Sequence, residues 1–180
     1  MKIRYINSNS RIIESAGNTI YQEKINNKWV LHRERLPAVI TPYHEQYYYH
    51  GIKITKEIAE GTLPVKKILE IKNAEIRRIA MYLAIEKVTS IAEKIDQFTP
   101  EQFQAEFKQL GIEMYTLYRI NEKKDELQPF VFLEMVDPSK RPVAKYYVRV
   151  PETVKDCKQA VAQSYGFKSW EEYIKDQKWV

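Results

Sequence analysis

Residues 73–78 read Asn-Ala-Glu-Ile-Arg-Arg and lie between an apolar segment that ends near Ile71 and a helical pattern that continues to about Ile85. Asn73 is a good N-cap, because its side-chain oxygen can accept a hydrogen bond from a free backbone N–H of the first helical turn. Glu75 places a carboxylate at the positive end of the same helix. The chain before this stretch predicts β-hairpins, and the chain after it predicts a small α+β body.

The charged residues of this helix are candidate contacts. Glu75 and Arg78 share one face with i, i+3 spacing, whereas Arg77 points elsewhere. A carboxylate flanked by Arg77 and Arg78 can hold a phosphate or act as a base. The structural alternative is a Glu75–Arg78 salt bridge, or a buried arginine that joins the helix to a sheet. We expect replacement of Arg78 to cost more stability than replacement of Arg77.

Composition predicts a folded protein outside the membrane. The 180 residues are 44% hydrophobic and 12% aromatic, which is enough for a packed core. The one cysteine, Cys157, excludes an intramolecular disulfide and fits a reducing compartment, and its apolar helical neighbours predict an inert buried thiol. No apolar run approaches the roughly 18 residues of a membrane helix, and the first residues lack the apolar core of a signal peptide. We therefore expect a cytoplasmic protein.

Most of the net charge belongs to the N-terminal segment. Residues 1–55 hold 8 basic and 4 acidic side chains and six tyrosines, whereas residues 56–110 hold 9 of each charge and residues 111–180 hold 12 basic and 11 acidic side chains. A basic, tyrosine-rich β surface is therefore expected here, with a protein as its partner or, alternatively, nucleic acid. The predicted contacts are Arg33, Arg35, Tyr47 and Tyr49.

An enzyme is the third alternative, with a phosphate-handling site made from Glu75 and the two arginines beside it. The chain contains no P-loop, no G-x-S-x-G, no H-E-x-x-H and no dinucleotide fingerprint. His32, His44 and His50 lack a spacing typical of metal ligands. We therefore predict no catalytic residues, no metal and no cofactor, and the best interpretation is a non-catalytic interaction or regulatory module.

The fold class expected is α+β, with a β-rich segment over residues 1–55 and an α+β domain over residues 56–180. The first segment should contain a strand at residues 3–6 and two hairpins, the first of which turns at Asn26-Asn27. A central helical block should follow. Its expected helices begin after Pro64, at Asn73 and at Thr99, and the spacing of Val88, Ile91, Ala92 and Ile95 predicts further helix.

The C-terminal part predicts an antiparallel sheet with a packed helix. Strands are expected at residues 113–120, 130–136 and 144–150, with a charged turn at residues 121–126. A helix should run from Pro151 to about Tyr165, and a short last helix should begin after Ser169. Trp170, Tyr173 and Trp179 are expected to attach this tail to the body.

The segments Leu31–Ile40, with His-Arg-Glu and Pro-Ala inside it, and Tyr47–Gly51 resemble one MORN-like β-hairpin repeat. Leu36 stands where that pattern prefers glycine. Such repeats usually form tandem arrays that serve as structural or interaction modules. A single copy implies a hairpin that packs on the rest of the chain.

A second resemblance covers roughly residues 45–166. Residues 73–78, with Val136-Asp137-Pro138-Ser139 and Tyr146 to Pro151, are similar to a bacterial domain of unknown function that is often found beside repeat segments. The family's usual tryptophan near Gln163 and glycine near Ala84 are missing. The resemblance implies a recognition role, and it carries no catalytic assignment.

Overall fold

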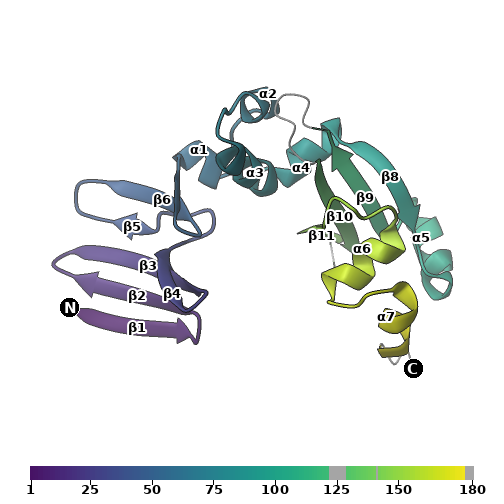
Figure 1. The fold of residues 1–180 in the computed structure, drawn as a ribbon, viewed down its shortest axis with the longest axis horizontal. Helices are drawn as coiled ribbons and strands as arrows, with labels where there is room; N and C mark the ends of the chain where they lie inside the picture. Colours follow the sequence, from purple (N-terminus) through teal and green to yellow (C-terminus); the bar gives the residue numbers. More distant parts are fainter. Residues whose placement is uncertain (122–128, 141, 177–180) are drawn as a thin grey trace. The chain divides into compact units, whose positions relative to one another are not determined.

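The computed structural model describes residues 1–121, 129–140 and 142–176, and its contacts divide the chain into two compact units, Met1–Val88 and Thr89–Val180. The predicted α+β class is confirmed, since both units contain an antiparallel sheet and helices (Figure 1). The domain boundary expected after residue 55 falls inside the first unit. Most of the predicted turn at residues 121–126, and Trp179, lie outside the described residues. None of the described helices has the length and apolar character needed to cross a membrane.

The first unit begins with a meandering sheet in the order β1-β2-β3-β5-β6-β7, in which β4 also pairs with β3. The predicted strands and hairpins of this segment are present. The strands are β1 (Lys2–Asn7), β2 (Ser10–Ser15), β3 (Asn18–Ile25), β4 (Lys28–Leu31), β5 (Val39–Ile40), β6 (Glu45–Tyr49) and β7 (Ile52–Ile54).

Strand β3 divides its pairing between two neighbours on one side. Its residues Thr19 and Ile20 pair with β5, whereas its residues from Gln22 to Ile25 pair with β4. The predicted Asn26-Asn27 turn is confirmed, with φ of 48° and 62°, because two positive φ values match the twist of a two-residue hairpin and asparagine tolerates them.

Four short helices complete the first unit: α1 (Lys56–Ala59), α2 (Val65–Leu69), α3 (Ala74–Leu83) and α4 (Ile85–Val88). The predicted cap is confirmed, because the backbone N–H of Ile76 donates to Asn73 Oδ1 at 3.0 Å. Helix α3 contacts both α1 and α2, and it buries Ile79, Met81 and Leu83. Gly61, which follows α1, has a φ of +65°.

The second unit contains a four-stranded sheet in the order β11-β10-β9-β8. Its strands are β8 (Glu93–Phe98), β9 (Tyr115–Ile120), β10 (Phe130–Asp137) and β11 (Ala144–Arg149). The three predicted strands are confirmed. The helix predicted around Ile91 and Ile95 is wrong beyond the short 3₁₀ turn η1 (Thr89–Ile91), because residues 93–98 pair with β9 and the ladder overrides the helical spacing.

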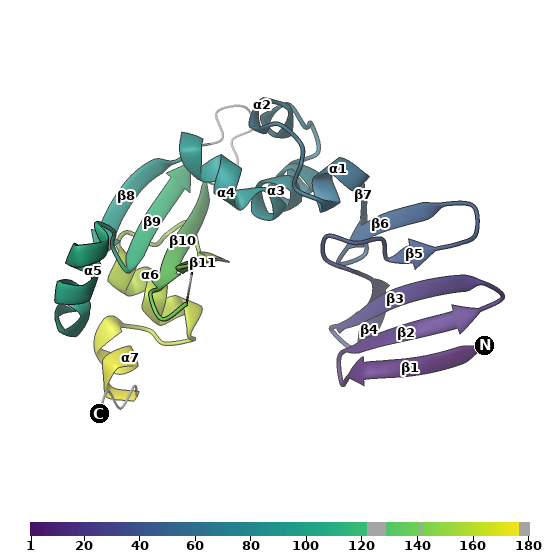
Figure 2. The same ribbon diagram turned by 180° about the vertical axis from the view of Figure 1, so that it is seen from behind.

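Helix α6 (Cys157–Ser164) packs on the sheet of the second unit, as the reverse view shows (Figure 2). It starts later than predicted, because Asp156 rather than the Pro151 region provides the cap. The 3₁₀ turn η2 (Glu101–Phe103), α5 (Gln104–Leu110) and α7 (Trp170–Asp176) complete the unit, and Gly111 ends α5 in the left-handed conformation. Leu117, Leu133 and Val161 lie in the core between sheet and helix.

We predict that Asn73→Ala lowers the free energy of unfolding by about 1 kcal/mol, because the Ile76 N–H loses its side-chain acceptor. Chemical denaturation followed by circular dichroism measures the loss. Lys72→Ala changes the exposed neighbouring residue, which is not the cap, and should leave stability almost unchanged. Equal midpoints for both variants and the parent would contradict the cap.

We predict that Gly61→Ala destabilises the protein more than Gly111→Ala. Both glycines are left-handed, with φ of +65° and +67°, so both variants carry the conformational cost of about 1 kcal/mol. A Cβ at Gly61 would also lie 2.5 Å from the Leu83 carbonyl oxygen, whereas a Cβ at Gly111 meets no atom within 4 Å. Denaturation curves of the two variants give the difference, and equal losses would argue against the close approach of α1 and α3.

Candidate functional site

One face of the N-terminal sheet carries apolar and aromatic side chains that are not buried. The register aligns Ile3 with Ile13 and Ile20, and Tyr5 with Arg11 and Gln22, so these rows share a face. The side chains of this open face are Ile3, Tyr5, Arg11, Ile13, Ile20, Gln22, Lys24, Trp29 and Leu31. Ile3 is 41% and Tyr5 61% exposed, and the others are intermediate. Within the described first unit, no second layer covers the apolar residues of this part of the sheet.

An aromatic and cationic group lies at the centre of the open face. The Tyr5 and Trp29 rings are 6.1 Å apart, and the Arg11 guanidinium lies 4.1 Å from the centroid of the Trp29 ring. The Arg11 Nε–H donates to Gln22 Oε1 at 2.9 Å, which holds the guanidinium plane over the indole. The group is preorganised, so a partner that binds it orders few side chains.

The two predicted arginine contacts lie in different surroundings. The Arg33 guanidinium stacks 3.8 Å from the centroid of the Tyr21 ring. Tyr21 alternates with Gln22 along β3, so Arg33 lies on the face opposite the open face. Arg35 has a side chain that is 55% exposed, and its Nε lies 3.9 Å from Glu34 Oε1. The structure does not unite these arginines in one patch with Tyr5.

The predicted tyrosine contacts are largely enclosed. Tyr47 is 7% exposed, so its side chain offers almost no surface to a partner, and its expected role as a contact is corrected on that ground. Its hydroxyl donates to Glu45 Oε2 at 3.0 Å. Tyr49 is half-buried, and burial raises the pKa of its hydroxyl. Tyr43 is 94% exposed and lies in the β5–β6 turn.

The Glu75, Arg77 and Arg78 group does not form one exposed set. Arg77 is 4% exposed and donates from Nη1 to the Ile71 carbonyl oxygen at 2.6 Å, so it is the more deeply buried of the two arginines. Glu75 is exposed, and Arg78 is half-buried. The buried Arg77 ties the start of α3 to the preceding segment at Ile71, whereas the structural alternative expected a buried arginine that joins the helix to a sheet.

Two of the three histidines, His32 and His50, form a cluster with Glu23 that the sequence analysis missed. Glu23 Oε2 lies 2.8 Å from His50 Nδ1 and 3.8 Å from His32 Nε2. The two imidazole rings stack with 4.2 Å between centroids and 8° between planes, and Tyr49 contacts both edge-on. The pKa of His32 is lowered, first by burial and then by the neighbouring His50.

The potential ligand atoms of this cluster all lie within 4.8 Å of one another. The geometry nevertheless fits a metal ion poorly, since an ion binds near the plane of each imidazole and the two planes here are nearly parallel. His32 Nδ1 also accepts the backbone N–H of His50 at 3.0 Å, so the neutral ring carries its proton on Nε2, the atom that faces Glu23. The cluster therefore fits a hydrogen-bonded junction between β3, the end of β4 and the β6–β7 turn.

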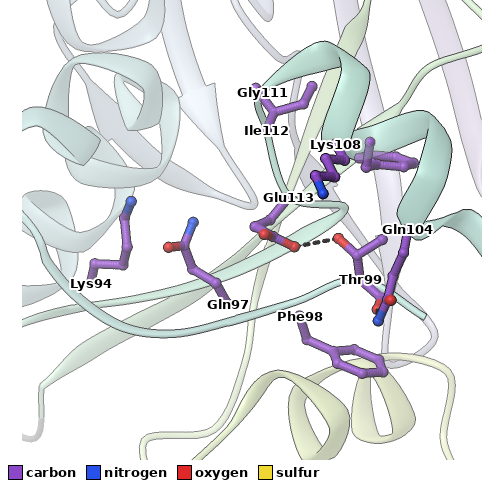
Figure 3. Close-up of a pocket in the computed structure, with 10 residues that line it drawn as sticks. Lys94, Gln97, Phe98, Thr99, Gln104, Lys108, Gly111, Ile112 and Glu113 are labelled. Carbon is purple, nitrogen blue, oxygen red and sulfur yellow. Dashed lines mark hydrogen bonds between the residues drawn. The ribbon is translucent and has the colours of Figure 1, made fainter. Parts of the chain in front are cut away.

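The second unit carries an open pocket of about 790 Å³ between β8 and α5 (Figure 3). Phe98 forms part of its wall, and Lys94 and Lys108 contribute cations. The polar side chains at its base are occupied, because Thr99 Oγ1 donates to Glu113 Oε2 at 2.5 Å and accepts the Met114 N–H at 2.9 Å.

Cys157 fits the inert core thiol that the sequence predicts. It is fully buried, and burial together with Asp96 raises the pKa of the thiol to about 12. A thiol with so high a pKa stays protonated at neutral pH and is a poor nucleophile. Its backbone N–H donates to Asp96 Oδ2 at 2.8 Å, so the residue serves to join α6 to β8.

Comparison of the chain with protein-family models, with curated proteins and with solved structures found no match. A sequence signal for the open face exists. Ile3 and Tyr5, Arg11 and Ile13, and Trp29 and Leu31 stand two residues apart, which is the spacing of side chains on one face of a strand. Pairing the strands of each hairpin outward from its turn places these side chains on one face of the sheet.

We predict that the first unit loses stability as the pH falls from 7 to 5.5. Burial lowers the pKa of His32 in the folded state below its usual value near 6.5, so the unfolded chain binds the proton more readily and acid favours unfolding. Thermal unfolding at several pH values measures this slope. His32→Asn keeps an acceptor near the position of Nδ1 and should flatten the slope.

The matched control is His44→Asn, which removes a histidine of the exposed β5–β6 turn. This variant should keep the parental slope. The same slope in the parent and in His32→Asn would show that another group controls the acid sensitivity.

Proposed function

We propose that this chain is a non-catalytic protein-interaction module that binds its partner through the open face of the N-terminal sheet. The single observation that carries the proposal is the Tyr5–Trp29–Arg11 group, in which Tyr5 is exposed and Trp29 and Arg11 are half-buried, on an apolar sheet face that no second layer covers among the described residues of the first unit. A sheet normally buries its apolar face against a second layer. A protein partner supplies such a layer.

The composition of the open face supports a protein partner. Tyrosine, tryptophan and arginine are the residue types enriched at the energetic centres of protein interfaces. The half-buried isoleucines Ile13 and Ile20 together offer nonpolar contact area, and their side chains provide no hydrogen bonds to bases or phosphates. The MORN-like resemblance of residues 31–51 points the same way, because such repeats usually serve as interaction modules.

The basic charge of this region favours a partner with an acidic surface. Strands β1 to β4 and their turns contain Lys2, Arg4, Arg11, Lys24 and Lys28 against Glu14 and Glu23. Glu23 also contacts His50, so its charge is engaged in the cluster. An acidic surface with apolar residues is the complement of this region.

We predict that Tyr5→Ala combined with Arg11→Glu lowers partner binding at least tenfold, since it removes an exposed aromatic anchor and reverses the central charge. The partner is first isolated from native cell extract on the immobilised parental chain and identified by mass spectrometry. It is then purified, and its Kd is measured by calorimetry for parent and variant.

The matched control is Tyr43→Ala with Lys53→Glu, which makes the same aromatic truncation and a matching charge reversal at exposed positions outside the nine side chains of the open face. It should keep the parental Kd, and circular dichroism verifies folding of both variants. Equal losses in the two variants would refute the open face as the interface. Binding to random oligonucleotides that weakens steeply with salt and depends on Arg11 would instead assign the surface to nucleic acid.

A further inference from the structure

Strand β1 forms a free edge of the N-terminal sheet (Figure 1). It pairs with β2 along Lys2 to Asn7, and it ends the strand order on that side. All six of its residues are exposed. Alternate backbone N–H and C=O groups of an edge strand point away from its neighbour, so β1 presents a row of hydrogen-bonding groups to any strand that approaches.

The side chains of β1 differ sharply between its two faces. Ile3 and Tyr5 continue the rows of the open face, whereas Lys2 and Arg4 lie on the other face. A strand added beside β1 would therefore place one set of its side chains against Ile3 and Tyr5, and the alternate set against Lys2 and Arg4. Directly opposed charges of opposite sign stabilise such a pair, and like charges oppose it.

We infer that β1 accepts an extended partner segment whose sequence alternates acidic and apolar residues, which adds to the sheet as a further strand. This inference deepens the proposed function and rests on it, since it names the class of partner. The backbone of the segment supplies hydrogen bonds to the edge of β1, its apolar residues extend the open face, and its carboxylates pair with Lys2 and Arg4.

A second copy of this chain fits the edge less well. Antiparallel pairing of two β1 strands around a twofold axis brings Lys2 and Arg4 of both copies to the same face of the junction. The acidic residue nearest in the pairing, Glu14, lies on β2 and is already opposite Lys2. Charge complementarity therefore selects a heterologous acidic strand.

The test uses capped synthetic peptides with the isotope-labelled full chain. The first peptide alternates valine and glutamate over six residues, the second carries lysine in place of glutamate, and the third keeps the glutamates but has proline at the valine positions. Backbone amide shifts and amide exchange of residues 2–7 are followed during titration to millimolar peptide. We expect the first peptide to shift and protect these amides, and to bind about tenfold more tightly than the second, because two charge pairs change sign.

The acidic proline peptide separates strand pairing from simple charge attraction, because proline lacks the N–H that a ladder needs. It should leave the amide exchange of β1 unprotected. Lys2→Glu with Arg4→Glu changes two exposed side chains and should reverse the preference, so that the lysine peptide binds more tightly. The control variant Lys53→Glu should keep the parental preference.

Three results would overturn the inference: unprotected β1 amides at saturating acidic peptide, an unchanged preference in the charge-reversed variant, or protection of β1 that grows with protein concentration in the absence of peptide. The last would identify a second copy as the occupant. If the peptides fail while the native partner still depends on Tyr5 and Arg11, the strand addition is refuted and the proposed function stands.

Discussion

The first unit depends on the pairing of β3. This strand pairs with β2 from Asn18 to Glu23 on one side, and on the other side with β5 near its start and with β4 near its end. Each strand pairing fixes which side chains share a face, because a slip of one residue would exchange the two faces. The register at β3 therefore aligns Tyr5, Arg11 and Gln22, and it also brings Glu23 to the side of His32. Both the open face and the histidine cluster follow from this one strand.

Local chemistry made much of this fold predictable, and long-range pairing explains the failures. The Asn73 cap and the Asn26-Asn27 turn depend on contacts within four residues, so the sequence identifies them. Strand β8 was missed because the spacing of Ile91 and Ile95 matches a helix, and its partner β9 lies about twenty residues further along the chain. A helical period over a short segment cannot outweigh a complete antiparallel ladder.

The sequence predicts the region of the candidate site, but it does not predict which residues form it. Charge and tyrosine content drew attention to residues 1–55, the region of the proposed site, yet they say nothing about which tyrosine is buried. Tyr47 is enclosed and Tyr5 is exposed because β6 contacts α1, whereas β1 lies at the edge of the sheet. The histidine cluster was missed for a related reason, since His32 and His50 are 18 residues apart and meet only when the end of β4 reaches the β6–β7 turn.

The two ends of the N-terminal sheet have different physical roles. At the β6 end, the Tyr49 ring packs against the stacked histidines, and its centroid lies 6.1 Å from that of the Tyr82 ring of α3. This end of the sheet is therefore attached to the helices. At the β1 end, Ile12 is the one buried residue among the strands β1 to β4, so pairing and cross-strand contacts hold these strands with little apolar burial. Four strand spacings separate β1 from β6 in the sheet order, which is about 19 Å. A partner strand at β1 would therefore bury apolar surface at the end of the sheet where the least is buried. It would leave the attachment of β6 to the helices undisturbed.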